Sequence, residues 1–245
     1  MAPDISLNGK AALVTGGARR IGRGIALALA RAGADVTITY RGSADDATSV
    51  INEIEKMGRN AQAVACNVRV ESEVRAAVAA TVTFHGRLDV LVNNAAIFEA
   101  TPIEQMTVEQ WDAVLETNVR GPFLITREAI QHLRAVKGRI VNMGSLGGLQ
   151  PWPDHAHYCS SKAAVHMLTK VMAKAFAPDV SVNAIAPGWI GFEGDRAEDA
   201  ERSRQQTPIQ RNGSVQDIAD AVLYFVTNSG FVTGQILAVD GGLGL

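Results

Sequence analysis

Four residues have the types and spacing needed for proton transfer to a substrate oxygen. Tyr158 and Lys162 lie four positions apart in a segment predicted as helix, Tyr158 to Phe176, so their side chains share one face. An ammonium beside the ring favours the phenolate and is expected to lower the tyrosine pKa. Such a phenol gives a proton when a carbonyl is reduced and takes one when an alcohol is oxidised. Ser145, 13 residues upstream, is expected to hold the substrate oxygen, and Asn118 precedes it on another helix.

A glycine-rich turn near the N-terminus suits a dinucleotide. Thr15 to Gly24 follows the first apolar run and leads directly into a helical segment. Glycines there let backbone amides approach a pyrophosphate, which then lies at the positive end of the helix. The place of this turn between strand and helix favours a binding site over a tight loop. Contacts are expected from Gly16, Ala18, Arg19, Arg20, Ile21 and Gly22.

The end of the second predicted strand indicates which dinucleotide binds. An NAD site normally has an acid there, which holds the ribose 2′-hydroxyl. Here Tyr40 and Arg41 occupy this place. An arginine suits the 2′-phosphate of NADP, and Arg19 or Arg20 offers a second cation. The sequence therefore predicts NADP(H), although a purely solvated loop position for Arg41 is the alternative.

Short β-branched apolar runs alternate with longer helix-forming segments. The runs are residues 11–15, 36–39, 61–66, 88–92, 139–143, 180–185 and 236–239. Most are apolar throughout, as strands covered on both faces should be. This pattern predicts an α/β, doubly wound fold with a seven-stranded parallel sheet, formed by residues 1–245 as a single domain.

Five helices are expected between the strands, and a sixth before the last strand. The five are residues 21–31, 45–57, 71–84, 108–133 and 158–176. The sixth begins at Ser214, an N-cap followed by Asp217 in the first turn, and runs to about Val226. The long irregular stretch from Pro187 to Gly213 is expected to act as a lid, because connections of that length are usually functional.

Composition excludes several classes of function. The net charge of -2 comes with no basic patch, which argues against nucleic acid or an anionic membrane surface as partner. Residues 1–10 lack a secretory apolar region and no run could span a membrane, so we expect a soluble, cytoplasmic protein. Cys66 and Cys159 have neither zinc-site nor disulfide-framework spacing.

Histidines and tryptophans near Tyr158 need an interpretation. His155 and His157 precede it, but no metal-binding pattern accompanies them, so we expect no metal and read both as residues of a pocket rim. Trp152 and Trp189 are candidates for the wall of a substrate cleft, and packing in the core or at an interface is an equal alternative.

Together these motifs resemble the short-chain dehydrogenase/reductase family, from about Leu7 to Gly242. The resemblance rests on the glycine-rich turn, on Asn93 to Ala96, on the Asn, Ser, Tyr and Lys tetrad, on Pro187-Gly188, and on Thr233 to Gly242. It implies a Rossmann-like fold and a homotetramer. It also implies that Tyr158 is the acid/base, that Lys162 binds the nicotinamide ribose as well, and that Asn118 positions a water. Further cofactor contacts are implied for Tyr40, Arg41, Asn67, Val68, Asn94, Ala95, Ala96, Pro187, Gly188 and Ile190.

The chain departs from the family pattern at Arg20, Ala96 and Phe192, where glycine, glycine and threonine are usual. The first and third departures resemble pteridine reductases, whereas Ser145 stands where those enzymes often have an acid. We therefore expect a 3-oxoacyl-carrier-protein-reductase-like enzyme that transfers a hydride from NADPH to a carbonyl. A pteridine reductase is the alternative enzyme. An NADP-sensing binding module is a third possibility, which the complete tetrad disfavours.

Overall fold

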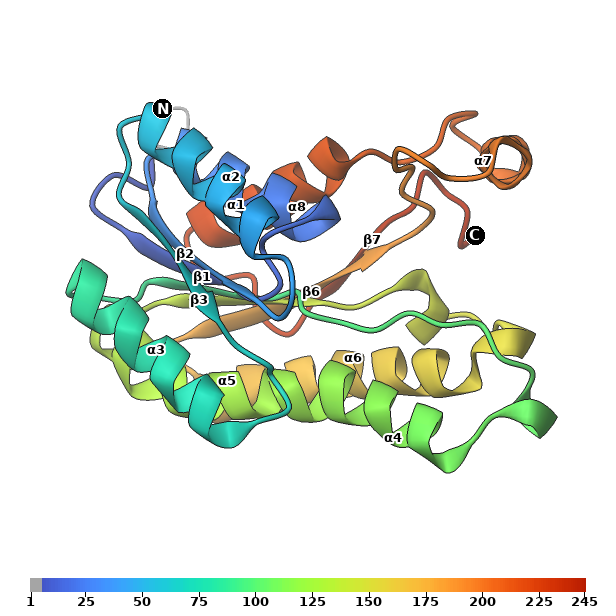
Figure 1. The fold of residues 1–245 in the computed structure, drawn as a ribbon, viewed down its shortest axis with the longest axis horizontal. Helices are drawn as coiled ribbons and strands as arrows, with labels where there is room; N and C mark the ends of the chain where they lie inside the picture. The colour runs from blue at the N-terminus through green and yellow to red at the C-terminus, as the bar shows by residue number, and fades with distance from the viewer. Residues whose placement is uncertain (1–5) are drawn as a thin grey trace.

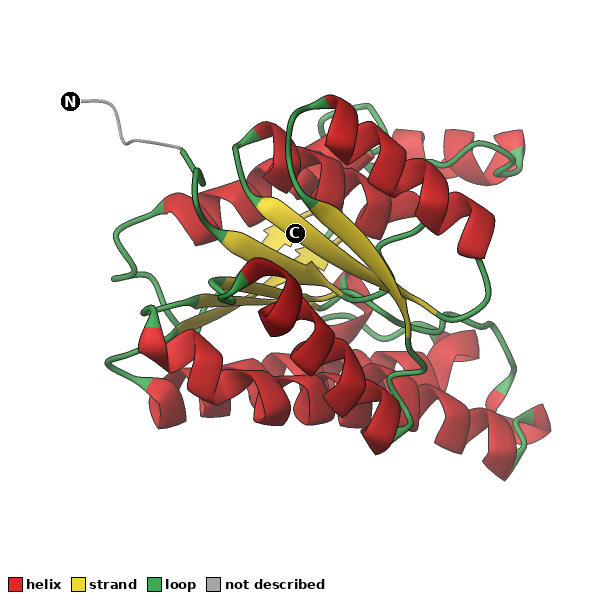
Figure 2. Cartoon of the chain, turned by 60° about the vertical axis from the view of Figure 1, so that its left-hand side comes forward, coloured by secondary structure: helices red, strands yellow, loops and turns green. Residues whose placement is uncertain are grey.

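A computed structural model describes residues 6–245 and contains one seven-stranded sheet between two layers of helices (Figures 1 and 2). Every neighbouring pair of strands is parallel, and the order is β3-β2-β1-β4-β5-β6-β7. The strands are β1 Ala11–Val14, β2 Asp35–Tyr40, β3 Ala61–Ala65, β4 Val90–Asn93, β5 Arg139–Met143, β6 Ser181–Pro187 and β7 Ile236–Val239. The predicted doubly wound parallel fold is confirmed. The single-domain prediction covers residues 1–245, of which 1–5 lie outside the described residues.

The order of the strands places a crevice beside β1. This strand pairs on one side with β2, where Val14 lies opposite Ile38, and on the other with β4, where Val14 lies opposite Val92. The chain direction around the sheet reverses at this point, and in open α/β sheets ligands bind outside the carboxyl ends of such strands. All residues of β1 and β4 are buried, which explains why these strands are apolar apart from Asn93 at the end of β4.

Helices cover both faces of the sheet. They are α1 Arg20–Arg31, α2 Ala44–Lys56, α3 Glu71–His85, α4 Val108–Leu115, α5 Gly121–Ala135, α6 Ala156–Phe176, α7 Ala197–Gln206 and α8 Val215–Thr227. Helices α1, α2 and α8 lie on one face, and α3, α4, α5 and α6 on the other (Figure 1). One apolar cluster fills each side, with Ile25 and Phe225 in the first and Leu91 and Leu133 in the second.

The predicted helix 108–133 is interrupted. Between α4 and α5 the residues Glu116–Arg120 form a π-helical turn, in which the Gly121 amide donates to the Glu116 carbonyl. The sequence contains the cause, since Pro122 has no N–H to donate to the carbonyl of Asn118 four positions earlier. Turns of this kind inside helices frequently mark functional sites.

The stretch from Pro187 to Gly213 is not irregular throughout, and in this respect the prediction is wrong. It contains α7, whose sequence is almost entirely polar, so no apolar stripe announced a helix. The Gly191 amide donates to the Gly213 carbonyl, and the Gly213 amide donates to the Trp189 carbonyl, each at 3.0 Å. These bonds close the neck of an excursion that carries α7 to one end of the molecule (Figure 1).

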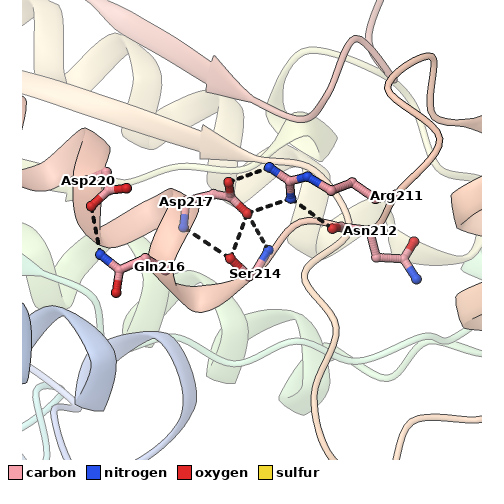
Figure 3. Close-up of polar contacts among 6 residues, drawn as sticks. All are labelled: Arg211, Asn212, Ser214, Gln216, Asp217 and Asp220. Carbon is pink, nitrogen blue, oxygen red and sulfur yellow. Dashed lines mark hydrogen bonds and ion pairs between the residues drawn. The ribbon is translucent and has the colours of Figure 1, made fainter.

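The segment that returns from the excursion, Arg211 to Ser214, is held by contacts with the first turn of α8, as Figure 3 shows. The Ser214 and Asp217 side chains each accept a hydrogen bond from the other residue's backbone N–H, which confirms the predicted N-cap. The Asp217 carboxylate also accepts two bonds from the Arg211 guanidinium, at 2.6 and 2.8 Å, and these hold its pKa below its ordinary value. Asn212 donates to the Ala200 carbonyl at 2.8 Å and so ties the neck to α7.

Candidate active site

A cavity of about 910 Å³ at the carboxyl ends of the strands brings the two predicted sites together. Its size and position suit a cofactor together with a small substrate. Three predicted residues, Ala18, Asn118 and Ser145, are buried and are not among the residues that line it. The predicted residues that do line it are Gly16, Arg19, Arg20, Ile21, Gly22, Tyr40, Arg41, Asn67, Val68, Asn94, Ala95, Ala96, Tyr158, Lys162, Pro187, Gly188 and Ile190.

The glycine-rich turn is held from the end of β4. The Asn94 side-chain amide donates to the carbonyls of Thr15 and Gly16 at 2.9 and 3.0 Å. A Cβ at Gly22 would lie 2.3 Å from the Gly16 carbonyl oxygen, so only glycine allows this packing of α1 against the turn. No side chain caps the first turn of α1 and no acid lies in it. This helix end therefore presents free N–H groups toward an anion.

The three candidate cations differ in their surroundings. Arg19 pairs with Asp46 on α2, and the Arg20 guanidinium lies 5.2 Å from the centre of the Phe192 ring. Two of the departures from the family pattern are thus in contact with each other. Arg41, directly after β2, is exposed, and within residues 6–245 it forms no ion pair with an acid. Of the three, Arg41 is the cation with no protein partner.

Lys162 lies beside Tyr158, but the net shift of the tyrosine pKa is opposite to the predicted one. Its Nζ donates to the Met143 carbonyl at 2.7 Å and lies 5.6 Å from the centre of the Tyr158 ring. Burial lowers the pKa of Lys162 to about 8. Burial also raises the pKa of Tyr158, against the opposing effect of a hydrogen bond with Ser145. The predicted lowering of this pKa is therefore wrong for this structure, and Tyr158 is a neutral phenol at neutral pH.

Ser145 and Asn118 are fixed by their own hydrogen bonds. The Ser145 hydroxyl caps a short helical turn, η3 (Leu146–Gly148), by accepting from the Gly147 amide at 3.1 Å. The Asn118 side chain accepts from the Ile97 amide at 2.8 Å and donates to the Ile97 carbonyl and the Ser161 hydroxyl, each at 3.0 Å. Asn118 therefore joins the loop after β4 to α6 by its side chain.

Several residues of the cavity were not predicted as site residues. Among them are Phe98 after β4, Leu243 near the C-terminus, and Asp199, Arg202, Ser203 and Gln206 on α7. The place of Phe98, four residues after Asn94, was a usable signal, since residues after the end of a strand face the crevice. The residues of α7 lie within the stretch predicted as a lid, but none of them was singled out, because the helix itself was not predicted.

The histidine prediction is half right. His155 lines the cavity, whereas His157 is fully buried and accepts a hydrogen bond from the Tyr158 amide. Trp152 and Trp189 both line the cavity, as the cleft-wall alternative expects. Within residues 6–245 no group of three or more His, Cys, Asp or Glu residues is arranged to hold a metal ion. No helix in that range combines the length and apolarity needed to cross a bilayer.

Comparison with known proteins agrees with this geometry. A family described as "Enoyl-(Acyl carrier protein) reductase" matches residues 16–244. The 3-oxoacyl-[acyl-carrier-protein] reductase FabG of Staphylococcus aureus strain N315 is 39% identical over 240 residues, 96% of this chain and 98% of the relative.

Two solved structures extend the comparison to cofactors. A 7α-hydroxysteroid dehydrogenase complexed with NADH and 7-oxo glycochenodeoxycholic acid is 33% identical, with a TM-score of 0.93 over 98% of this chain and 96% of that one. A blue fluorescent protein from a metagenomic library, in complex with NADPH, is 34% identical, with a TM-score of 0.91 over 97% and 99% of the two chains. By sequence and by fold, this chain belongs to the short-chain dehydrogenase/reductase family of nicotinamide-dependent oxidoreductases.

Proposed function

We propose that the protein, as a single domain over residues 1–245, reduces a ketone of a small substrate with NADPH. The observation that carries this is the placement of Tyr158, whose neutral phenol lines the cavity, forms a hydrogen bond with Ser145, and has Lys162 Nζ 5.6 Å from the centre of its ring. A neutral phenol can give a proton to the oxygen of a carbonyl that accepts a hydride. The relative from Staphylococcus aureus, a 3-oxoacyl-[acyl-carrier-protein] reductase, makes β-keto compounds the first substrates to try.

Two features of the cavity support NADP(H) as the cofactor. The uncapped first turn of α1 offers N–H groups to the pyrophosphate, with Gly16 and Gly22 leaving room for close approach. Arg41, with no acidic partner among residues 6–245, is available to the 2′-phosphate of NADP. Lys162 would bind the nicotinamide ribose, and Asn94 would lie along the cofactor.

The chain's own residues supply the proton and hold the substrate. When bound, NADPH supplies the hydride. Tyr158 donates its hydroxyl proton to the carbonyl oxygen, and Ser145 holds that oxygen by a hydrogen bond. At pH 7 Lys162, with a pKa of about 8, is mostly cationic and stabilises the phenolate left on Tyr158. Asn118 would position a water that returns a proton to Tyr158. Its backbone carbonyl is available for this, because Pro122, four residues later, has no N–H to donate to it.

One observation keeps a pteridine reductase as the second candidate. Arg20 replaces the usual glycine of the turn, has a positive φ of 49°, and contacts the Phe192 ring, and both residues line the cavity. Ser145, in place of an acid, argues for ketones instead. The NADP-sensing module is the least supported function, because a protein without turnover has no need for Tyr158, Lys162 and Ser145 together.

A substrate panel tests the proposed function directly. Purified protein with NADPH is incubated separately with acetoacetyl thioesters, ethyl acetoacetate, simple diketones and dihydrobiopterin, and the loss of absorbance at 340 nm is followed. We expect the highest kcat/KM with one of the ketones. Dihydrobiopterin as the only good substrate would establish the second candidate. NADPH binding without turnover on any compound would support the sensing module.

The excursion that carries α7 is expected to close over bound NADPH. Its body, residues 190–210, is joined to the sheet by the neck at Trp189 and Gly213, and four residues of α7 line the cavity. Trypsin cleavage at Arg196, Arg202 and Arg204 should therefore slow when NADPH is added. Cleavage at Arg59, in the turn after α2, serves as the control within the same digest. Equal rates at the α7 sites with and without saturating NADPH would count against closure.

The protein is expected to be a homotetramer in which α4, α5 and α6 pair across a two-fold axis. Exposed apolar side chains on these helices support such pairing, with Phe123, Met167 and Val171 each at least 44% exposed. Phe231, before β7, and Leu237, on β7, offer a second surface near the C-terminus. Light scattering coupled to size exclusion at micromolar protein should give about four times the 26.0 kDa chain mass. A stable, active monomer would refute this assembly.

A further inference from the structure

The cavity gathers a large share of the chain's aromatic side chains. The sequence contains seven Phe, three Trp and three Tyr residues, and six of these thirteen line the cavity. They are Tyr40, Phe98, Trp152, Tyr158, Trp189 and Phe192. Tyr40 and Phe192 also pack against the apolar core on one face of the sheet, whereas the other four belong to neither core cluster. The gathering of these four at one cavity therefore concerns what the cavity binds.

Two of these rings, together with the imidazole of His155, lie around the proposed acid. Phe98 lies edge-on to Tyr158, with ring centres 4.8 Å apart and planes at 79°. Trp152 lies parallel to Tyr158 at 6.1 Å and 10°. His155 stacks on Phe98 at 4.9 Å and 17°. We call Phe98, Trp152 and His155 the aromatic wall. A carbonyl held by Tyr158 must place one of its substituents against this wall.

Phe98 is exposed to solvent, and the backbone of the residue before it is held by hydrogen bonds. Phe98 is 61% exposed, even with its contacts to His155 and Tyr158. The preceding residue, Ile97, is fixed through both backbone polar groups by the Asn118 side chain. An aromatic surface that is exposed and already ordered loses little entropy when a ligand covers it.

A second contact fixes the two loops that form the wall. The Thr101 amide donates to the Asp154 carbonyl at 2.7 Å, and this joins the loop after β4 to the segment before α6. Burial lowers the pKa of His155, with a smaller opposing effect of Asp154, so its ring is neutral at pH 7. The wall thus presents uncharged ring faces and edges, which suit an uncharged planar group better than an anion.

We propose that the aromatic wall is a subsite for an aryl or other planar conjugated group attached to the substrate carbonyl, with Phe98 as the specificity-determining residue. The proposal rests on the carbonyl reductase function above. A flexible acyl chain or a saturated ring gains from burial of its surface alone. An aryl ring gains ring-to-ring contacts in addition. The comparison that isolates the subsite is therefore between an aryl ketone and its saturated analogue.

Two β-keto esters of equal carbon skeleton provide this comparison. Ethyl 3-oxo-3-phenylpropanoate carries a phenyl group on the ketone, and ethyl 3-cyclohexyl-3-oxopropanoate carries a saturated ring of the same number of carbons. The kcat/KM of each is measured with NADPH for the native protein, Phe98→Leu and Phe98→Tyr. Because the ratio of the two substrates is compared between variants, the intrinsic difference in their reactivity cancels.

Phe98→Leu is expected to lower the ratio of phenyl to cyclohexyl kcat/KM at least tenfold, mostly through a higher KM for the phenyl substrate. Phe98→Tyr keeps the ring and is expected to stay within about threefold of the native ratio. Phe84→Leu is the matched control, since Phe84 is 52% exposed, also contacts a histidine ring, and lies on α3 away from the cavity. An unchanged ratio in Phe98→Leu, or equal losses for both substrates, would overturn the proposal.

A binding measurement separates this proposal from the proposed function. Acetophenone and cyclohexyl methyl ketone are titrated into the complex with NADP⁺, in which no reduction occurs, and their dissociation constants are compared by calorimetry. Preference for acetophenone that is lost in Phe98→Leu supports the subsite even if no ketone in the panel is reduced. Equal affinity of the native complex for the two ketones overturns it even if ethyl acetoacetate is reduced well.

Discussion

Replacement of Tyr158 by Phe is expected to lower kcat at least about a hundredfold and to leave the Kd for NADPH near its native value. Only the hydroxyl is removed, so the ring contacts with Phe98 and Trp152 are retained. The proton that the carbonyl oxygen needs then has no positioned donor. Stopped-flow or steady-state measurement of kcat on the best ketone of the panel, with calorimetry for NADPH, separates the two effects.

Controls for this variant come from its two neighbours. Lys162→Ala should damage both kcat and NADPH affinity, because the side chain serves the phenol and the nicotinamide ribose. Ser145→Ala should lower kcat and leave NADPH affinity near normal. Wild-type turnover in Tyr158→Phe would show that the assigned acid is wrong and that another donor acts on the substrate.

The pH dependence of reduction follows from the same two groups. Burial raises the pKa of Tyr158, so the phenol stays protonated through neutral and mildly alkaline pH. Burial lowers the pKa of Lys162 to about 8, and its positive charge is lost as the pH rises through that value. The stabilisation that this charge gives to the developing phenolate is present below about pH 8 and is lost above it. Turnover limited by chemistry is therefore expected to fall on the alkaline side.

The fold could be predicted because its signals are local. Parallel strands covered on both faces are apolar throughout, and this pattern identified all seven strands to within two residues at most ends. The cap of α8 was equally local, since Ser214 and Asp217 are three residues apart. Helix α7 escaped prediction because ten polar and small residues at the surface carry no apolar period.

The site was predictable only in part, because the spacing of residues along the sequence does not reveal their burial or the contacts between loops. The interval between Tyr158 and Lys162 correctly places both in one cavity, but the direction of the tyrosine pKa depends on burial that spacing does not reveal. The aromatic wall is formed by Phe98 and by Trp152 and His155, from two segments more than fifty residues apart. These two segments become neighbours only in the folded sheet, where the carboxyl ends of the parallel strands lie along the same edge.

NADPH is expected to bind at least tenfold more tightly than NADH, a difference of about 1.4 kcal/mol, and Arg41→Asp is expected to abolish or reverse the preference. Arg19 is engaged by Asp46, and Arg20 lies over the Phe192 ring. Arg41 is thus the cation nearest the end of β2 that keeps its charge free for a 2′-phosphate. An aspartate there repels that phosphate and accepts from the 2′-hydroxyl of NADH.

Calorimetric Kd values for both cofactors, at one moderate salt concentration, test this. Arg31→Asp is the matched control, because Arg31 is exposed at the far end of α1 and the substitution changes the net charge equally. A general electrostatic effect would weaken NADPH binding similarly in both variants, whereas a direct contact confines the change to Arg41. Equal Kd values of the native protein for NADPH and NADH would contradict the assignment. So would a preference that survives Arg41→Asp, since the 2′-phosphate would then have to be held by Arg19 or Arg20 after each leaves its present partner.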